Sequence, residues 1–148
     1  MFQMAKIHIS SGGVIYRITS KNKIEILLLH KKNGKWHLPK GTQKEGENLE
    51  KTVLREVKEE TELETEIGKY LGKLPSLNED KEAKVTHYYL MKPCGGKIGI
   101  RKDEHNFDKV EWVEIEKVKQ LLREFTEFEK EEKIVGMAEK IIKKELCD

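Results

Sequence analysis

The pattern of apolar and polar positions is clearest in residues 41–63, where a loop containing two glycines leads into an amphipathic segment. From about position 49 the apolar residues recur at intervals of three and four, which predicts a helix with one buried stripe. This stripe consists of Leu49, Val53, Leu54 and Val57. Gly41 and Gly46 come before the helix, and both are free to adopt positive φ. We therefore expect a loop followed by a helix that packs on one side.

Apolar runs on either side of this segment predict β-strands. Residues 24–30 are almost continuously apolar, which is typical of a strand buried on both faces, and residues 85–91 are rich in aromatic and β-branched side chains. Further strands are expected at residues 7–9 continuing into 13–17, at 66–74, at 109–115 and, as a short one, at 97–100.

Small residues and turn signals set the connections between these strands. Ser10, Ser11 and Gly12 are small enough for a bulge or a close contact within the first strand. Asn33 and Gly34 together predict a tight hairpin turn after the second strand. Pro39 disfavours helix at the residue before it, so the loop that leads to the first helix starts from an extended segment.

Two helices are expected near the C-terminal end, at residues 116–124 and 127–146. The second carries an ordinary core-facing stripe, formed by Ile134, Met137, Ala138, Ile141 and Ile142. Strands mixed with helices predict an α/β sandwich around a mixed sheet. A length of 148 residues suits one domain with one substantial core, covering 1–148.

Composition and charge exclude several classes of protein. The formal net charge is only +2 although 38% of the residues are charged, so no general polyanion-binding surface is predicted. No apolar run approaches the ~20 residues of a membrane span, and the first residues show no signal-peptide core. Cys94 and Cys147 lie far apart, without metal-binding or redox spacing. A cytoplasmic protein with reduced thiols is the expectation.

Three glutamates of the predicted helix lie beside its apolar stripe. The i, i+3, i+4 spacing of Glu56, Glu59 and Glu60 places their carboxylates on one face. Such a run is most often a solvated face paired with lysines, but Glu56 and Glu60 have no cation three or four positions away. Because oxygen ligands are preferred by hard divalent cations, Mg²⁺ would convert this repulsion into binding. On this pattern alone, a metal site and a charged surface remain equally open.

The order of residues in this region resembles the signature of the Nudix hydrolases, Gly-x5-Glu-x7-Arg-Glu-U-x-Glu-Glu-x-Gly-U, in which U is aliphatic. The matching positions are Gly41, Glu47, Arg55, Glu56, Val57, Glu59, Glu60 and Leu63. Glu62 stands where the family has its last glycine, at the end of the helix, where glycine is common. The resemblance implies a Nudix-type α/β/α sandwich around a mixed sheet, with the loop before the helix forming the floor of the active site.

The resemblance also implies hydrolysis of a phosphoanhydride, which requires that a polyanion be neutralised and a water be delivered in line, as divalent ions do. The expected ligands of Mg²⁺ or Mn²⁺ are Glu56, Glu59 and Glu60, with a backbone carbonyl of Lys40 or Gly41 and a water-mediated role for Glu47. Glu47 has an alternative role as a partner of Arg55. Arg55 is expected to orient carboxylates, so the catalytic set is Glu60, Glu104, Arg55 and Glu59.

The resemblance further implies a general base from a late loop, for which Glu104, in the loop before the last strand, is the expected residue and Glu60 is the alternative. Recognition of a base needs a flat apolar surface. The candidates for substrate binding are therefore Tyr88, which is expected to stack a base, Trp36 and His37 beside the loop, and Lys40, which is expected to contact phosphate. For the three aromatic candidates, packing in the core or on the surface is an equally open role, and for an isolated lysine such as Lys40 an ordinary surface position is more common.

Short patches at residues 36–41, 87–90 and 104–105 look most like the diadenosine polyphosphate hydrolases within this family. The expected substrate is thus a nucleotide, and most of all a dinucleoside polyphosphate such as diadenosine tetraphosphate. The alternatives are a nucleoside triphosphate, as for the MutT-like enzymes, ADP-ribose, or a capped or triphosphorylated RNA 5′ end. A non-catalytic nucleotide sensor is the alternative of another class, and the complete carboxylate set argues against it. A monomer or a homodimer is expected.

Overall fold

The computed structural model describes residues 6–125 and 130–147. This part of the chain forms a seven-stranded sheet and three helices. The strands are β1 (His8–Ile18), β2 (Ile24–Lys31), β3 (Trp36–His37), β4 (Lys40–Thr42), β5 (Glu64–Leu77), β6 (Ala83–Gly95) and β7 (Phe107–Glu114). The helices are α1 (Leu49–Thr61), α2 (Ile115–Phe125) and α3 (Glu131–Cys147).

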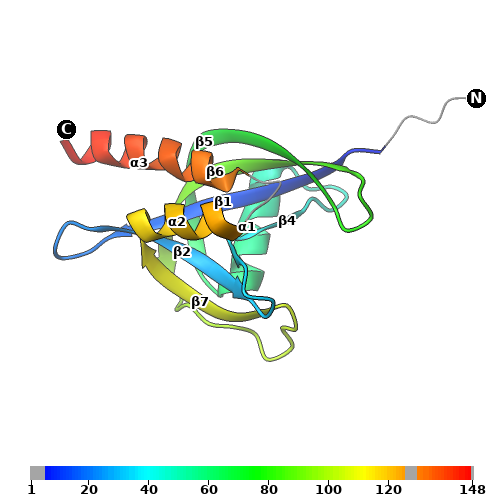
Figure 1. Cartoon of the computed structure of the whole chain (residues 1–148), viewed down its shortest axis with the longest axis horizontal. Helices are drawn as coiled ribbons and strands as arrows, with labels where there is room; N and C mark the ends of the chain where they lie inside the picture. Colours follow the sequence, from blue (N-terminus) through cyan, green and yellow to red (C-terminus); the bar gives the residue numbers. More distant parts are fainter. Residues whose placement is uncertain (1–5, 126–129, 148) are drawn as a thin grey trace, which may run out of the picture.

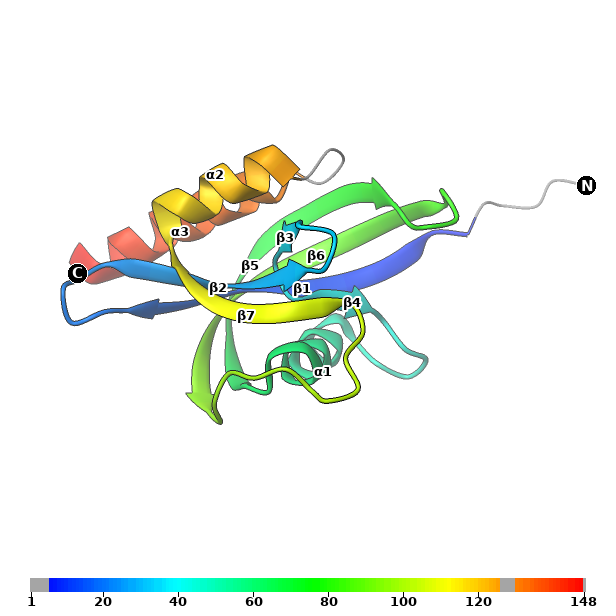
Figure 2. The same cartoon turned by 60° about the horizontal axis from the view of Figure 1, so that its bottom comes forward.

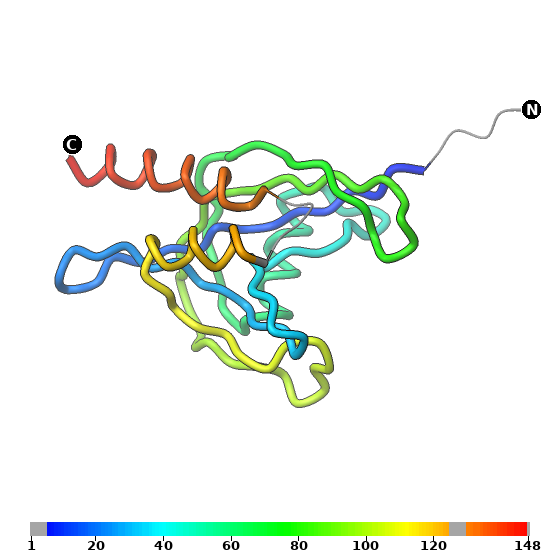
Figure 3. The backbone as a smooth tube through the Cα atoms, in the orientation of Figure 1, coloured from blue at the N-terminus to red at the C-terminus, as the bar shows by residue number. Residues whose placement is uncertain are grey.

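The sheet is mixed, as expected, and its strands follow the order β3-β2-β1-β6-β5. β1 pairs with β6 in parallel, whereas its pairings with β2 and β4 are antiparallel. β7 pairs with the outer side of β2. The backbone trace in Figure 3 follows the chain from the β2–β3 hairpin through β4 into the loop before α1. The parallel pair of β1 and β6 therefore lies at the centre of the sheet, and β1 also pairs with β4, the short strand that leads to helix α1.

Helices cover both faces of the sheet, with α2 and α3 on one side (Figure 1) and α1 on the other (Figure 2). Neighbouring residues of a strand point to opposite faces. In β1, Val14 accordingly packs in the core beneath α2 and α3, while Ile15 packs with Val53 of α1. This arrangement confirms the α/β/α sandwich that the sequence predicts.

The first strand is longer and more regular than the sequence indicated. β1 runs without interruption through the small residues, because Ser10, Ser11 and Gly12 pair with β4 on one side and with β6 on the other. Of the two alternatives that the sequence left open, a bulge or a close contact, the structure shows the close contact. A Cβ at Gly12 would lie 2.9 Å from Lys40 Cβ and 3.1 Å from Tyr88 Cε1. Glycine thus allows the chain before α1 to pack against the central sheet.

Helix α1 begins at Leu49 as predicted, and the side chain of Asn48 caps it by accepting a 2.8 Å hydrogen bond from Lys51 N. The buried stripe is narrower than predicted, because Leu54 is 37% exposed. In α3, Met137 is likewise exposed, whereas Ile134, Ala138 and Ile142 are buried. Leu54 and Met137 lie at the margins of their apolar stripes, next to the solvent-exposed faces of the two helices.

Two boundaries differ from expectation for reasons of pairing. β5 and β6 are longer than predicted because Glu64 and Thr65 pair with Gly95 and Pro93 at the end of the hairpin. Residues 97–100 form no strand. The expected start of the last helix, Glu127, lies outside the described residues. None of the described helices has the length and apolar character needed to cross a membrane.

Candidate active site

The carboxylates of α1 meet the backbone of β4. Glu60 Oε1 accepts a hydrogen bond from Lys40 N at 3.0 Å. A Cβ at Gly41 would overlap the carboxylate of Glu56, so only glycine leaves room for that group. Gly46 adopts positive φ (83°), but Gly41 does not. The signature glycine is therefore needed for space beside Glu56, not for an unusual backbone conformation.

Arg55 organises the acidic side chains of this region. Its Nε and Nη2 donate to the two carboxylate oxygens of Glu47 at 2.7 and 2.9 Å, a bidentate pair. Its Nη1 donates to Glu56 at 2.7 Å and to Glu59 at 3.3 Å. Nη2 also donates to the Thr42 carbonyl at 3.0 Å, which ties α1 to β4. Arg55 thus contacts three carboxylates, and for Glu47 the structure shows the pairing with Arg55.

The electrostatics divide the acidic residues into two groups. Hydrogen bonds from Arg55, and next from Lys44 N, lower the pKa of Glu47 to about 2. Burial, followed by the charge of Glu56, raises the pKa of Glu60 well above its usual range. Burial also raises the pKa of Glu56, although Arg55 opposes this. We call Glu56, Glu59 and Glu60 the carboxylate face. Because burial disfavours the negative charges of Glu56 and Glu60, a bound cation would stabilise both.

The donor set of the carboxylate face fits a hard divalent cation, because it consists of oxygen ligands that repel one another in a partly buried place. Within residues 6–125 and 130–147, no three His, Cys, Asp or Glu side chains are already arranged as a metal cluster. Instead Arg55 holds Glu56 and Glu59, and Lys40 N holds Glu60. The expected ligands are thus gathered on one side of α1, each with a partner that a cation would have to share or replace.

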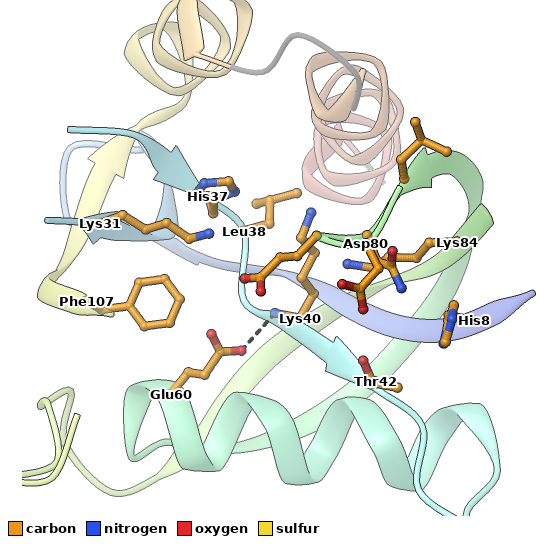
Figure 4. A pocket seen from close by; sticks show the side chains of 13 residues that line it. His8, Lys31, His37, Leu38, Lys40, Thr42, Glu60, Asp80, Lys84 and Phe107 are labelled. Carbon is orange, nitrogen blue, oxygen red and sulfur yellow. Dashed lines mark hydrogen bonds between the residues drawn. The ribbon is translucent and has the colours of Figure 1, made fainter. Parts of the chain in front are cut away.

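A pocket of about 480 Å³ adjoins Glu60, as Figure 4 shows. Its lining combines basic, acidic and a few apolar side chains: His8, Lys31, His37, Leu38, Lys40, Thr42, Glu60, Leu77, Asn78, Glu79, Asp80, Lys84 and Phe107. Burial and the nearby charge of Lys40 lower the pKa of Lys84. Three lysines therefore share the pocket with Glu60, Glu79 and Asp80, so cationic and anionic groups lie side by side in its lining.

Of the aromatic candidates, only His37 lines this pocket in the described structure. Both of its ring nitrogens are buried without a hydrogen-bond partner, and burial is the main reason why its pKa is lowered to about 4. A neutral imidazole thus borders the pocket at pH 7. Trp36 packs instead against the core and the ring of His30, with a centroid distance of 4.7 Å.

Stacking of a base on Tyr88 is a wrong prediction. Tyr88 is 0% exposed, and its hydroxyl donates a 2.7 Å hydrogen bond to Glu131. The alternation of side chains along β6 turns this ring into the core beneath α2 and α3. Phe107, at the start of β7, lines the pocket together with His37 (Figure 4). The sequence did not point to Phe107, which lies just before the strand expected at residues 109–115.

Glu104 lies in the loop before β7, where sequence analysis expected it. It is half-buried, its Oε1 accepts a hydrogen bond from Asn106 N at 2.8 Å, and its charge helps to raise the pKa of Glu60. The loop thus brings a further carboxylate near the carboxylate face. Its role as general base stays a prediction.

Two features of the site could not be read from the motif. Glu62, which replaces the last signature glycine, ends α1 in the left-handed conformation, with φ 67° and ψ 9°. Glu131 is completely buried and contacts Lys40 and Tyr88. In the sequence it lies within a run of charged residues at 129–133, where a solvated helix start is the ordinary interpretation.

Comparisons with known proteins agree with this geometry. Residues 8–133 match the NUDIX domain family. Nudix hydrolase 6 of Arabidopsis thaliana is 31% identical over 110 residues, which are 70% of this chain and 39% of the plant protein. The chain spans less than half the length of the curated relatives it matches.

Solved structures share the fold at lower identity. A Caenorhabditis elegans Ap4A hydrolase in a binary complex has a TM-score of 0.76 and 23% identity, and the match covers 91% of this chain and 97% of the worm chain. A MutT protein from Methanosarcina mazei has a TM-score of 0.71 and 20% identity, with coverage of 96% and 99%. The signature helix, the sandwich around it and the match over residues 8–133 together show that this chain belongs to the Nudix hydrolase family.

Proposed function

We propose that the chain is a Mg²⁺- or Mn²⁺-dependent pyrophosphohydrolase of dinucleoside polyphosphates such as diadenosine tetraphosphate. Members of the family generally use divalent metal ions. The observation that supports the proposal most is the junction of Glu60 with a pocket that also contains Lys31, Lys40 and Lys84. Glu60 would contribute to binding a cation, and the three lysines would contact a chain of phosphates.

The carboxylate face has the first role in this proposal. Glu56, Glu59 and Glu60 would hold the metal, together with a carbonyl of Lys40 or Gly41, and Arg55 keeps these carboxylates oriented. The bound ion would neutralise phosphate oxygens and lower the pKa of a bound water. A water then attacks one phosphorus atom, the bond to the bridging oxygen breaks, and two phosphate-ended products form.

The other side chains bind the substrate and move one proton. Lys40 contacts the phosphates from the pocket wall, as Lys31 and Lys84 do from either side. Glu104 accepts the proton of the attacking water, since it stands near Glu60 yet outside the pairs made by Arg55. Phe107 offers its ring to one base at one end of the pocket. His37 borders the pocket as a neutral imidazole with free nitrogens.

The pocket favours a polyphosphate chain with one held base over two equivalent base sites. Among the described residues, Phe107 is the only Phe, Tyr or Trp side chain in the lining, whereas the lysines extend along the phosphate path. Attack would then occur at a fixed distance from the single base-binding end. Diadenosine tetraphosphate should give ATP and AMP, not two molecules of ADP.

The test is a substrate screen with Mg²⁺ in ¹⁸O-water, with the products separated and weighed. Diadenosine tetraphosphate, ATP, ADP-ribose and a 5′-triphosphorylated RNA are compared at equal concentration. The proposal predicts preferred cleavage of the dinucleotide to ATP and AMP. Two ADP as the main product would contradict the single base-binding end, and faster hydrolysis of another substrate would assign the enzyme to that class. Tight binding without turnover of any of them would indicate a sensor.

A lysine variant tests the phosphate path separately. Lys84→Gln should raise KM for diadenosine tetraphosphate about tenfold with little change in kcat, because a charge-assisted contact to bound phosphate is lost. Lys117→Gln, an exposed lysine of α2 outside the pocket lining, is the matched control. An unchanged KM in the Lys84 variant would remove Lys84 from the phosphate path.

A further inference from the structure

Glu131 is a buried carboxylate with no place in the signature. It starts α3 and is 0% exposed. Its Oε2 accepts hydrogen bonds from Tyr88 OH at 2.7 Å and from Lys40 Nζ at 3.3 Å, and its Oε1 accepts one from Leu38 N at 3.4 Å. A carboxylate taken out of water requires such donors, because burial without them is costly. These three donors therefore identify the parts of the fold that the Glu131 carboxylate fixes in position.

Two of these three donors, Leu38 N and Lys40 Nζ, belong to residues 38–40, the segment that ends with the first residue of β4. On its other side, Lys40 N donates to Glu60 Oε1 at 3.0 Å. Between them, the Pro39 carbonyl accepts a 3.0 Å hydrogen bond from Gly13 N of β1. Segment 38–40 is thus held by α3, by the central strand and by α1 at once. A shift of its backbone at Glu131 would move the N–H group that holds Glu60.

Tyr88 completes this connection. Its ring packs against Gly12, with Tyr88 Cε1 3.1 Å from the position a Cβ of Gly12 would take, and its hydroxyl points to Glu131. A phenol held rigidly in the core fixes the position of the carboxylate that accepts its hydrogen bond. The tyrosine that is too buried to stack a base therefore anchors Glu131.

We propose that Glu131 is a positioning residue of the active site, which fixes segment 38–40 from the α3 side of the sheet so that Lys40 N–H holds Glu60 on the carboxylate face. Glu131 touches neither substrate nor metal in this scheme. It acts through the backbone of Lys40, and Tyr88 supports it. The inference deepens the proposed function, since it concerns the placement of a proposed metal ligand.

A purely structural role in attaching α3 is the competing explanation, and the chain offers a matched control. Glu139 is also on α3 and is 8% exposed. Its partners are Lys119 of α2 and Lys143 of α3, not segment 38–40. Glu139→Gln and Glu131→Gln both remove a buried charge from the same helix. Only Glu131→Gln is expected to disturb Lys40 and Glu60.

The experiment measures amide hydrogen exchange of Lys40 by NMR and Mn²⁺ binding by electron paramagnetic resonance, in the full chain without substrate. Glu131→Gln should accelerate exchange of the Lys40 amide and weaken Mn²⁺ binding by about tenfold or more, as the loss of a ligand-orienting partner generally does. Glu139→Gln should lower the melting temperature but change neither readout. Equal effects of the two substitutions, or an unchanged Lys40 amide in a folded Glu131→Gln protein, would overturn the inference.

Tyr88→Phe provides a second variant that keeps the packing of the ring. It should shift both readouts in the same direction as Glu131→Gln, and the double variant should be no worse than Glu131→Gln alone, because the two residues act in one chain of contacts. If the effects of the two substitutions on Mn²⁺ binding multiplied in the double variant, Tyr88 would not act through Glu131. If the wild-type chain bound no Mn²⁺, the proposed function would fail, whereas exchange of the Lys40 amide would still decide the role of Glu131.

Discussion

The backbone N–H of Lys40 donates a 3.0 Å hydrogen bond to Glu60, and this contact joins β4 to the carboxylate face of α1. This hydrogen bond favours the charged form of Glu60 and so lowers its pKa. Burial and the neighbouring Glu56 act in the other direction. The protein backbone therefore fixes the position of Glu60, while burial and Glu56 still disfavour its negative charge. A bound cation would stabilise that charge.

Gly41→Ala tests whether space beside Glu56 is what the signature glycine provides. The added methyl group would overlap the Glu56 carboxylate, so we expect Mg²⁺-dependent turnover to fall by a factor of about ten or more, as on loss of a ligand-orienting contact. Circular dichroism should show an unchanged fold. The control is Gly136→Ala in α3, where a Cβ meets nothing within 4 Å. That variant should be fully active and slightly more stable, and normal turnover of Gly41→Ala would refute the explanation.

Glu62→Gly should stabilise the protein. Glu62 adopts φ 67°, a left-handed conformation that costs a side-chain-bearing residue about 1–2 kcal/mol. The greater entropy of glycine in the unfolded chain offsets part of this gain, which leaves about 0.5–1 kcal/mol. The measurement is denaturant unfolding beside Glu50→Gly, an exposed position in the first turn of α1, where glycine should destabilise by about 1 kcal/mol. If both variants lost stability, Glu62 would make a contact that stabilises the fold by more than its left-handed backbone conformation costs.

His37 should give the protein a pH-dependent loss of stability in acid. Its pKa is lowered to about 4 in the folded protein, mainly by burial, against 6.5 for an ordinary histidine. Between these values the unfolded chain binds the extra proton, so the free energy of unfolding falls as pH decreases from about 6.5 toward 4, by at most about 3 kcal/mol.

The raised pKa values of Glu56 and Glu60 act in the opposite sense, because the folded state then binds protons more readily than the unfolded chain. The measurement that isolates His37 is therefore the difference between wild type and His37→Gln in denaturant unfolding at pH 7 and pH 4.5. The variant should lose less stability than wild type over this interval. Parallel curves would show that the imidazole is protonated without penalty.

The parts of the fold that follow from local pattern could be predicted from the sequence. Leu49 starts α1 because Asn48 caps it, and the β2–β3 turn forms at Asn33 and Gly34 as their residue types indicate. The carboxylate face could be placed because i, i+3, i+4 spacing fixes which side chains of a helix are neighbours.

What could not be predicted depends on contacts between distant parts of the chain. Tyr88 and Tyr89 alternate along β6, and only the packing of α2 and α3 decides which faces the core and which the side of α1. Glu131 lies 91 positions from Lys40 in the sequence. Its burial requires α3 to dock beside segment 38–40, and a run of charged residues carries no sign of this. The missed residue and the wrong stacking assignment have the same cause, since Tyr88 and Glu131 are each other's partners.

The most direct test of the carboxylate face as a metal centre is turnover of Glu60→Gln with saturating Mg²⁺ and diadenosine tetraphosphate, beside Glu66→Gln, an exposed glutamate of β5. Loss of a charged ligand should lower kcat of Glu60→Gln by orders of magnitude. Its melting temperature without metal should hold or rise, because repulsion with Glu56 is removed. Glu66→Gln should match wild type in both respects. A Glu60→Gln protein with near-normal kcat would contradict the assignment of this face as the site of the chemistry.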